Sequence, residues 1–257
     1  MQTPIVILHV WGASVKSHDK LKLLLEQKGI SVFVFDLPGF GSEPAPSSAW
    51  SVDDYVEWVL IKIEKELDSR FRGSDKIESA NNGNKIILFG HSFGGRIAIK
   101  MAAKYPEKLA GLILCDAAGI TPRPKAKINL FARLSKVGKI IFSLPILNYV
   151  EPIAKKIIYF LVGAKDYSRL QDPAMKEVFK KVVEENLMPY LGKISLPTLI
   201  VWGKQDKMTP VSDAYVIKEK IRGSKLEILE NIGHSPHLEC PEKISGIIMK
   251  FIRSLGK

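Results

Sequence analysis

Short apolar runs alternate with longer amphipathic stretches along this chain of 257 residues. Most of the short runs are rich in Ile, Val, Leu and Phe and carry few polar residues, which is typical of strands buried on both faces of a parallel sheet. We predict strands over residues 5–10, 31–35, 85–89, 109–115, 198–202 and 226–229. Apolar positions at helical spacing predict helices over residues 16–28, 52–67, 93–104, 211–221 and 241–254. This alternation predicts an α/β fold with a doubly wound, mostly parallel sheet and right-handed crossovers.

Two stretches interrupt the alternation. Residues 68–84 are polar and include two glycines and several asparagines, which predicts a flexible surface insertion. Residues 120–195 contain six prolines and several amphipathic runs but no convincing strand, which predicts a helical insertion. The insertion carries more apolar residues than a solvated loop could expose, so it must cover another part of the molecule. We therefore expect a core of residues 1–119 and 196–257 with an inserted helical domain at 120–195.

The composition is that of a globular protein, but its charge is unevenly distributed. Hydrophobic residues make up 46% and charged residues 25% of the chain, and the net charge is +11. Residues 120–195 hold 14 Lys and Arg against 6 Asp and Glu, whereas the rest of the chain holds 24 against 21. No RNA-recognition or zinc-finger pattern accompanies this excess, so we expect no nucleic-acid partner. Two interpretations stay open: a solvated lysine-rich surface, or a surface that attracts an anionic carrier protein or an anionic membrane.

Cysteine content and the start of the chain bear on its location. The two cysteines, Cys115 and Cys240, are far apart and suggest neither a disulfide framework nor a zinc site. The first residues lack the cationic segment of a signal peptide, and no uncharged apolar run reaches membrane-spanning length. These features predict a cytoplasmic protein.

The sequence GHSFGG at residues 90–95 follows one predicted strand and begins one predicted helix. This is the layout of a nucleophile elbow, in which a serine lies at the tip of a tight strand-to-helix turn. Gly90 and Gly94 have no Cβ, so neighbouring backbone can approach closely there. Because serine is a poor nucleophile unless its surroundings activate it, Ser92 needs a base and an orienting acid.

The chain offers five histidines as candidate bases: His9, His18, His91, His234 and His237. We expect His18 on an exposed helix start, and the His91 backbone lies within the elbow itself. His234 follows Gly233 in the loop after the last predicted strand, at the carboxyl edge of the sheet where α/β proteins build their sites. We therefore predict His234 as the base, with His237 as its rival.

Two aspartates compete for the role of the acid. Asp206 follows the strand at 198–202, and Asp116 ends the strand at 109–115. A lone aspartate at a strand end is usually a turn or cap residue. The chain order Ser92, Asp206, His234 matches one known order of nucleophile, acid and base, which favours Asp206.

An acyl-transfer site also needs two backbone N–H groups that stabilise the developing oxyanion. Phe93 follows the nucleophile at a helix N-terminus, where free amides and the helix dipole favour an anion. Trp11, in the loop after the first strand, is our second donor.

Five motifs in this order resemble the α/β-hydrolase superfamily over essentially the whole chain. Besides the elbow, the acid loop and the loop of His234, HVWG at residues 9–12 resembles its oxyanion loop, with Val10 where the family usually has glycine. DLPGFGS at residues 36–42 resembles a signature loop, in which we expect Asp36 to order the turn. The resemblance implies six parallel strands, with the first two strands of the full fold absent. It also implies that residues 120–195 form a helical cap over the site.

Our leading hypothesis is a carboxylic-ester hydrolase that acts through an acyl-enzyme on Ser92, on a small-molecule ester and without a metal or organic cofactor. A serine at this position, in place of aspartate, argues against haloalkane dehalogenase and epoxide hydrolase chemistry. Three alternatives remain: a carbon–carbon bond hydrolase, a hydrolase of carrier-bound or lipid esters, and a non-catalytic ligand-binding member of the fold. The sequence does not determine the acyl group or the oligomeric state.

Overall fold

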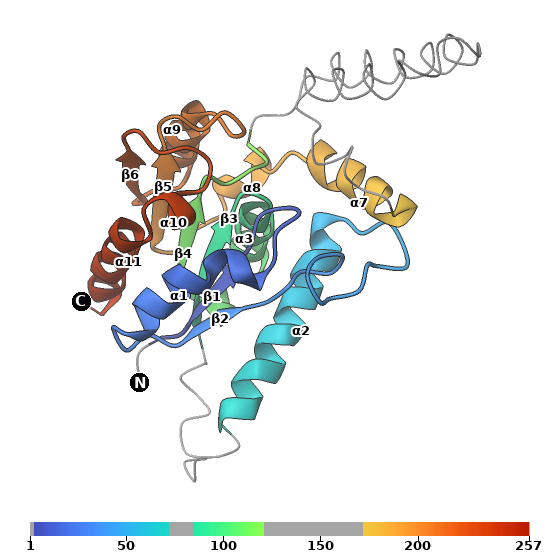
Figure 1. Cartoon of the computed structure of the whole chain (residues 1–257). Coiled ribbons are helices and arrows are strands. Elements are labelled where there is room, and N and C mark those ends of the chain that lie inside the picture. Colours follow the sequence, from blue (N-terminus) through green and yellow to red (C-terminus); the bar gives the residue numbers. More distant parts are fainter. Residues whose placement is uncertain (1–2, 72–84, 121–171, 257) are drawn as a thin grey trace.

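The computed structural model describes residues 3–71, 85–120 and 172–256, which contain one sheet of six parallel strands (Figure 1). The strand order is β2-β1-β3-β4-β5-β6. The strands are β1 (Ile5–Leu8), β2 (Val32–Val34), β3 (Ile86–His91), β4 (Leu109–Cys115), β5 (Thr198–Gly203) and β6 (Lys225–Leu229). The structure thus confirms the predicted α/β class and all six predicted strands.

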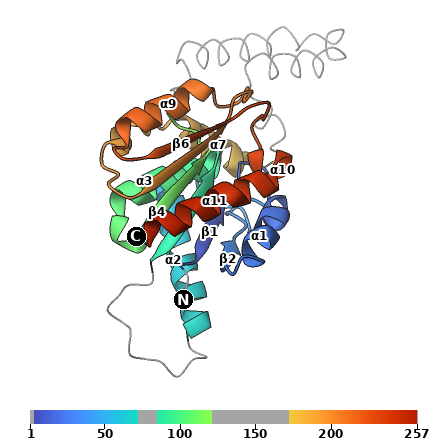
Figure 2. The same cartoon turned by 90° about the vertical axis from the view of Figure 1, so that its left-hand side faces the viewer.

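Helices cover both faces of this sheet, because parallel strands that follow one another along the chain need crossover connections (Figure 2). Before β4 the chain forms the 3-10 helix η1 (Val15–His18), α1 (Asp19–Glu26), α2 (Val52–Phe71), α3 (Phe93–Lys104) and η2 (Pro106–Lys108). After residue 171 it forms α7 (Pro173–Glu184), α8 (Met188–Leu191), α9 (Val211–Lys220), α10 (Pro236–Glu239) and α11 (Pro241–Leu255). None of the helices in the described ranges is both long enough and apolar enough to cross a membrane.

Alternate side chains of a strand enter two separate hydrophobic clusters, which explains the continuous apolar runs of the sequence. In β1, Val6 and Leu8 pack into the cluster that includes residues of α2 and α3. Ile5 and Ile7 pack into the opposite cluster, with residues of α1 and α11. A strand covered on both sides has no solvent-facing position, so it shows no polar alternation.

Several element boundaries differ from the predicted ones. The first strand ends at Leu8 rather than at residue 10, and β3 continues to His91. Helix α2 runs to Phe71, so residues 68–71 of the expected surface insertion are helical. Residues 72–84 of that insertion lie outside the described residues.

His18 does not lie on an exposed helix start, and that prediction is wrong. The chain enters α1 through a 3-10 turn, and His18, its last residue, is fully buried. Its ring stacks on that of His237, with the centroids 4.1 Å apart. The tighter 3-10 turn changes which side chains face the core, and helical periodicity counted across it misplaces His18.

Of the predicted helical insertion, the structure describes residue 120 and residues 172–195. This part forms α7 and α8, and α7 buries an apolar face made of Met175, Val178, Phe179 and Val182. The remainder, residues 121–171, lies outside the described residues.

Candidate active site

Ser92 lies between the last residue of β3 and the first residue of α3, with φ 52° and ψ −107°. Its N–H donates to the Cys115 carbonyl at 3.1 Å, and its own carbonyl accepts from the Ala118 N–H at 3.0 Å. These bonds tie the turn between β3 and α3 to the residues at the end of β4, and Ser92 is 6% exposed. The strained backbone is that of a nucleophile elbow.

The glycines of the elbow permit two close approaches of backbone. A Cβ at Gly90 would lie 2.5 Å from the Gly94 oxygen, and a Cβ at Gly94 would lie 2.2 Å from the Leu8 oxygen. Both distances are well below van der Waals contact, so neither position accepts a larger residue without a shift of the backbone.

The predicted base and acid are in contact. His234 Nδ1 and Asp206 Oδ2 are 2.6 Å apart. Since an ionised carboxylate only accepts hydrogen bonds, Nδ1 carries the proton and Nε2 holds the free lone pair. The Nε2 atom is buried and has no hydrogen-bond partner among the described residues. His234 therefore has the tautomer that a general base requires.

The loop after β5 holds Asp206 through three further donors. The N–H groups of Met208 and Thr209 donate to Oδ1 at 2.7 and 3.1 Å, and the Thr209 hydroxyl donates to Oδ2 at 2.6 Å. Burial raises the pKa of Asp206, but the hydrogen bonds from His234, Thr209 and Met208 outweigh burial and lower the pKa. The carboxylate is thus ionised and aimed at His234.

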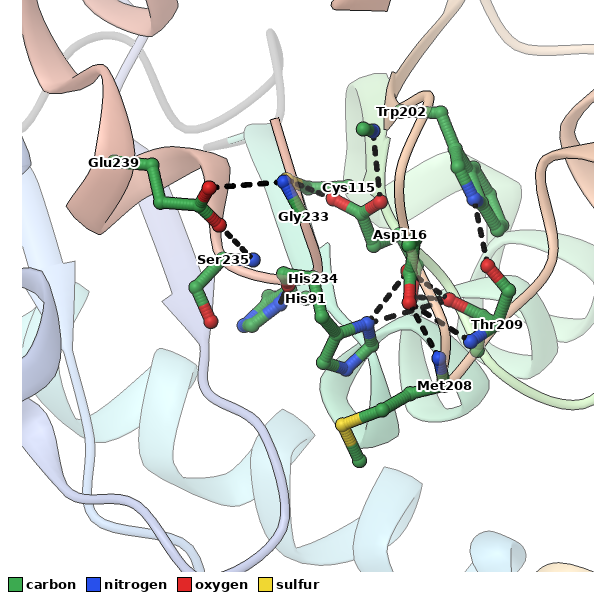
Figure 3. A network of polar contacts seen from close by, with 12 residues as sticks. His91, Cys115, Asp116, Trp202, Met208, Thr209, Gly233, His234, Ser235 and Glu239 are labelled. Atoms are coloured by element: carbon green, nitrogen blue, oxygen red, sulfur yellow. Dashed lines mark hydrogen bonds and ion pairs between the residues drawn. The ribbon is translucent and has the colours of Figure 1, made fainter. Parts of the chain in front are cut away.

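Two residues that the sequence analysis did not assign hold the loop of His234. His91 Nε2 donates to the His234 carbonyl at 2.7 Å, which ties this loop to the residue before Ser92. The carboxylate of Glu239 accepts from the N–H groups of Gly233 and Ser235, on either side of His234 (Figure 3). In the sequence, this contact is indicated only by the position of Glu239, which lies six residues after Gly233 and ends α10.

The two rival residues, His237 and Asp116, do not form this pair. Both ring nitrogens of His237 are buried without a hydrogen-bond partner among the described residues, so it is His234 that pairs with Asp206. Asp116 lies beside the pair: one of its carboxyl oxygens, one oxygen of Asp206 and one ring nitrogen of His234 are all within 4.8 Å of one another.

The two predicted oxyanion donors also flank the elbow. The Phe93 N–H is in the first turn of α3, where amides have no acceptor within the helix. The Trp11 N–H, in the loop after β1, has no backbone acceptor among the described residues. The Trp11 ring contacts those of Phe93, Phe40 and Phe179, with centroids 5.1, 4.8 and 5.1 Å apart, so an aromatic wall lies beside the elbow.

His9 and Asp36 organise the loops around this wall. The Leu37 N–H donates to His9 Nε2 at 3.0 Å, so His9 Nδ1 carries the proton and donates to the Val10 carbonyl at 2.8 Å. Asp36 accepts from the Val15 N–H and from both the N–H and the hydroxyl of Ser42. Asp36 therefore orders its turn, as the sequence predicted.

Two groups of described residues bring three potential metal ligands within 4.8 Å: His18, His91 and His237, and Asp116, Asp206 and His234. In the first group, the planes of His18 and His237 are 5° from parallel. A nitrogen lone pair lies in the plane of its ring, so one ion cannot lie in both planes unless a ring turns. In the second group, an ion would have to replace the 2.6 Å contact between Asp206 and His234. Neither group is preformed for a metal.

Comparison with known proteins identifies the family of the chain. A sequence profile of the α/β hydrolase fold matches residues 3–136 and 176–241. A proline iminopeptidase from Saccharolobus solfataricus is 28% identical over 278 residues, which cover 96% of this chain and 84% of the relative. A monoacylglycerol lipase from Xenopus laevis is 30% identical over 245 residues, which cover 89% of this chain and 69% of the relative. A 2-hydroxy-6-oxononadienedioate/2-hydroxy-6-oxononatrienedioate hydrolase from Klebsiella pneumoniae is 26% identical over 249 residues, which cover 89% and 78%.

Solved structures agree on the fold. An esterase from Thermogutta terrifontis superposes with a TM-score of 0.69 at 22% identity, over 100% of this chain and 92% of that protein. The similar proteins are hydrolases that differ in the substrates for which they are named. Since the family profile covers most of the sequence and the sheet has the matching architecture, the chain belongs to the α/β hydrolase fold family.

Proposed function

We propose that this protein is a serine hydrolase that cleaves carboxylic esters through an acyl-enzyme on Ser92. The observation that carries the proposal is the 2.6 Å contact between His234 Nδ1 and Asp206, which leaves His234 Nε2 as a free acceptor. His91, adjacent to Ser92, bonds the carbonyl of His234, so the base and the strained serine belong to one constellation.

In the proposed mechanism, Ser92 Oγ attacks the ester carbonyl and His234 Nε2 takes its proton. Asp206 stabilises the imidazolium, and the N–H groups of Trp11 and Phe93 stabilise the oxyanion. His234 then protonates the leaving alcohol, and a water activated by the same ring releases the acid. Loss of one oxyanion donor costs roughly 3–4 kcal/mol in other enzymes, so these amides carry much of the rate.

The aromatic wall of Trp11, Phe40, Phe93 and Phe179 supports an ester with an apolar acyl group. A monoacylglycerol lipase among the relatives favours the same substrate class. The second candidate is a carbon–carbon bond hydrolase, favoured by the relative named for 2-hydroxy-6-oxo dienedioates. Both reactions use the same nucleophile and base, so only the substrate distinguishes them.

We also propose that residues 120–195 form a cap over this site. In support, the Phe179 ring of α7 packs against the Trp11 ring. Met175 of α7 lies so close to Gly39 that a Cβ at Gly39 would be 2.4 Å from the Met175 side chain. Residues 172–195 hold four basic and four acidic residues, so the positive excess of the insertion lies in residues 121–171, with ten against two. Any contact with an anionic carrier protein or membrane would belong to that segment.

A fluorophosphonate probe tests the nucleophile. We expect the wild-type protein to react at Ser92 and to hydrolyse p-nitrophenyl acyl esters, and we expect Ser92→Ala to lose both activities while remaining folded. Ser235→Ala is the matched control, because Ser235 lies in the neighbouring loop and has no assigned chemical role. Labelling that persists in Ser92→Ala would refute the assignment.

A substrate panel separates the candidates. Acyl esters of increasing chain length, an aminoacyl p-nitroanilide and a 2-hydroxy-6-oxo dienoate are offered to the same preparation. We expect the highest kcat/KM with an ester, and preference for the dienoate would establish the carbon–carbon reaction instead.

A further inference from the structure

Asp116 is a fully buried carboxyl group directly beside the Asp206–His234 pair. It directly follows β4, its N–H donates to the Val201 carbonyl of β5 at 3.1 Å, and its φ is 44°. Because β4 and β5 are parallel neighbours, their ends bring Asp116 and Asp206 to the same point of the sheet edge. The proximity of the two carboxyl groups is therefore built into the sheet.

Few donors face Asp116. The Gly203 N–H donates to its Oδ1 at 2.9 Å, and the Cys115 thiol, a weak donor, lies 3.5 Å from its Oδ2. The other titratable groups that act on it are Asp206, His234 and, more distantly, Cys240. No lysine or arginine of the described ranges forms an ion pair with Asp116.

Two adjacent buried carboxyl groups cannot both ionise without a large cost, so they share one proton. Asp206 receives four hydrogen bonds, from His234, Met208 and the N–H and hydroxyl of Thr209, and these lower its pKa against the effect of burial. Burial raises the pKa of Asp116 to about 8; the Gly203 N–H opposes this rise, and the charge and hydrogen bond of Asp206 add to it. At neutral pH the shared proton therefore resides on Asp116.

We propose that Asp116 is a positioning residue, a neutral carboxyl group that donates a hydrogen bond to Asp206 and keeps a single negative charge beside His234. This inference rests on the proposed role of His234 as the base. The hydrogen bond adds a fifth donor to Asp206 and helps to fix the carboxylate against His234. When Asp116 loses its proton, Asp206 loses this donor and the two carboxylates repel each other, so Asp206 is no longer held against His234.

The proposal predicts an alkaline fall in kcat/KM. A group with a pKa of about 8 is about nine-tenths protonated at pH 7 and about one-tenth protonated at pH 9. Because the proposal assigns the full activity to the protonated form, wild-type kcat/KM should fall between these values, by about tenfold at most. Asp116→Asn keeps an acceptor for Gly203 and a donor for Asp206 but cannot ionise. Relative to its own value at pH 7, this variant should lose the alkaline fall.

Cys115→Ala is the matched control, because burial also raises the pKa of the Cys115 thiol and its ionisation could produce an alkaline effect. This variant should keep the alkaline fall. A fall that persists in Asp116→Asn, or one that disappears in Cys115→Ala, would overturn the proposal.

Carboxyl 13C NMR of aspartate-labelled protein provides a readout that does not depend on hydrolysis. We expect one aspartate resonance to titrate near pH 8 in the wild type and to be missing in Asp116→Asn. If every aspartate carboxyl finishes its titration below pH 6, Asp116 is ionised at neutral pH and the proposal is wrong. If the resonance is present but no substrate is hydrolysed, the proposed function fails while the shared proton stands.

Discussion

At the scale of single residues, Ser92 has a backbone conformation that lies outside the regions open to residues with a side chain. Such a conformation costs on the order of 1–3 kcal/mol, and the surrounding hydrogen bonds hold it in place. The strain arises largely from Cβ, so it should depend on the residue at position 92 and not on the hydroxyl group.

We predict that Ser92→Gly is more stable than Ser92→Ala by about 1 kcal/mol. Glycine has no Cβ, so it removes the strain. This gain in stability is partly offset, because the glycine variant has roughly 0.5–1 kcal/mol more conformational freedom in the unfolded state. Both variants lack the hydroxyl, so the comparison isolates the backbone, and urea unfolding measures it. A Ser92→Ala protein that is more stable than Ser92→Gly by about 0.5–1 kcal/mol, the conformational term alone, would show that Ser92 is not strained.

The sequence was informative for residues that sit in motifs and poor for residues that support them. Ser92 and His234 could be proposed as candidates because a glycine-rich turn or a loop at a strand end surrounds each of them. Thr209 and His91 could not be assigned, because their partners depend on how two loops meet. His18 was misplaced because a 3-10 turn broke the helical periodicity.

At the scale of elements, α3 joins the elbow to α7. Arg96 Nη1 donates to the carbonyls of Val182 and Glu185 at the end of α7, where carbonyls have no N–H donor within the helix. One turn further along α3, the buried Lys100 contacts Asp53 of α2 at 2.6 Å and also contacts Glu185. The helix that begins at Ser92 thus fixes the position of α7 and of its residue Phe179.

We predict that Lys100→Met lowers the free energy of unfolding by about 2 kcal/mol. The change leaves Glu185 and Asp53 without their shared cation. The loss of unfolding free energy stays below that of a fully buried ion pair, because Asp53 is 44% exposed. Lys104→Met is the control, since Lys104 also contacts Asp53 but is 40% exposed and should cost less than about 1 kcal/mol. Similar losses in both variants would refute a special role for Lys100, and thermal or urea unfolding measures both.

The pattern of elements was predictable where burial alone decides it. The strands from β1 to β5 are covered on both faces, so their sequences are mostly apolar. Each of these strands can therefore be located along the chain from its apolar run. For α7, the periodicity of Met175 and Phe179 indicates an apolar face but not its partner. The contact of Phe179 with Trp11 depends on Arg96 and Lys100, which hold α7 in place. Arg96 binds backbone carbonyls and Lys100 binds carboxylates, and no local sequence pattern reveals these partners.

At the scale of the whole molecule, three buried histidines join parts of the chain that are distant in sequence. His18 is the last residue of η1, His91 is the last residue of β3, and His237 lies in α10, next to the loop of His234. Burial lowers the pKa of all three, and their mutual repulsion when charged adds to this for His18 and His91. The cluster is therefore neutral in the folded protein, and protonation must act against folding.

We predict that the protein loses stability in mild acid and that His237 carries a measurable share of the loss. The pKa of His237 is lowered to about 4 from 6.5, so between these values the unfolded state binds the proton and the folded state does not. This stability is complete above pH 6.5 and declines as the pH falls, and His237 alone should contribute a loss of about 2 kcal/mol between pH 7.5 and pH 5. His237→Phe should show a correspondingly smaller difference in urea unfolding between the two pH values. Carboxylates such as Asp206, whose pKa is lowered, reduce the stability only at more acidic pH. If the difference in unfolding free energy between pH 7.5 and pH 5 is the same in His237→Phe as in the wild type, groups other than His237 cause the acid sensitivity.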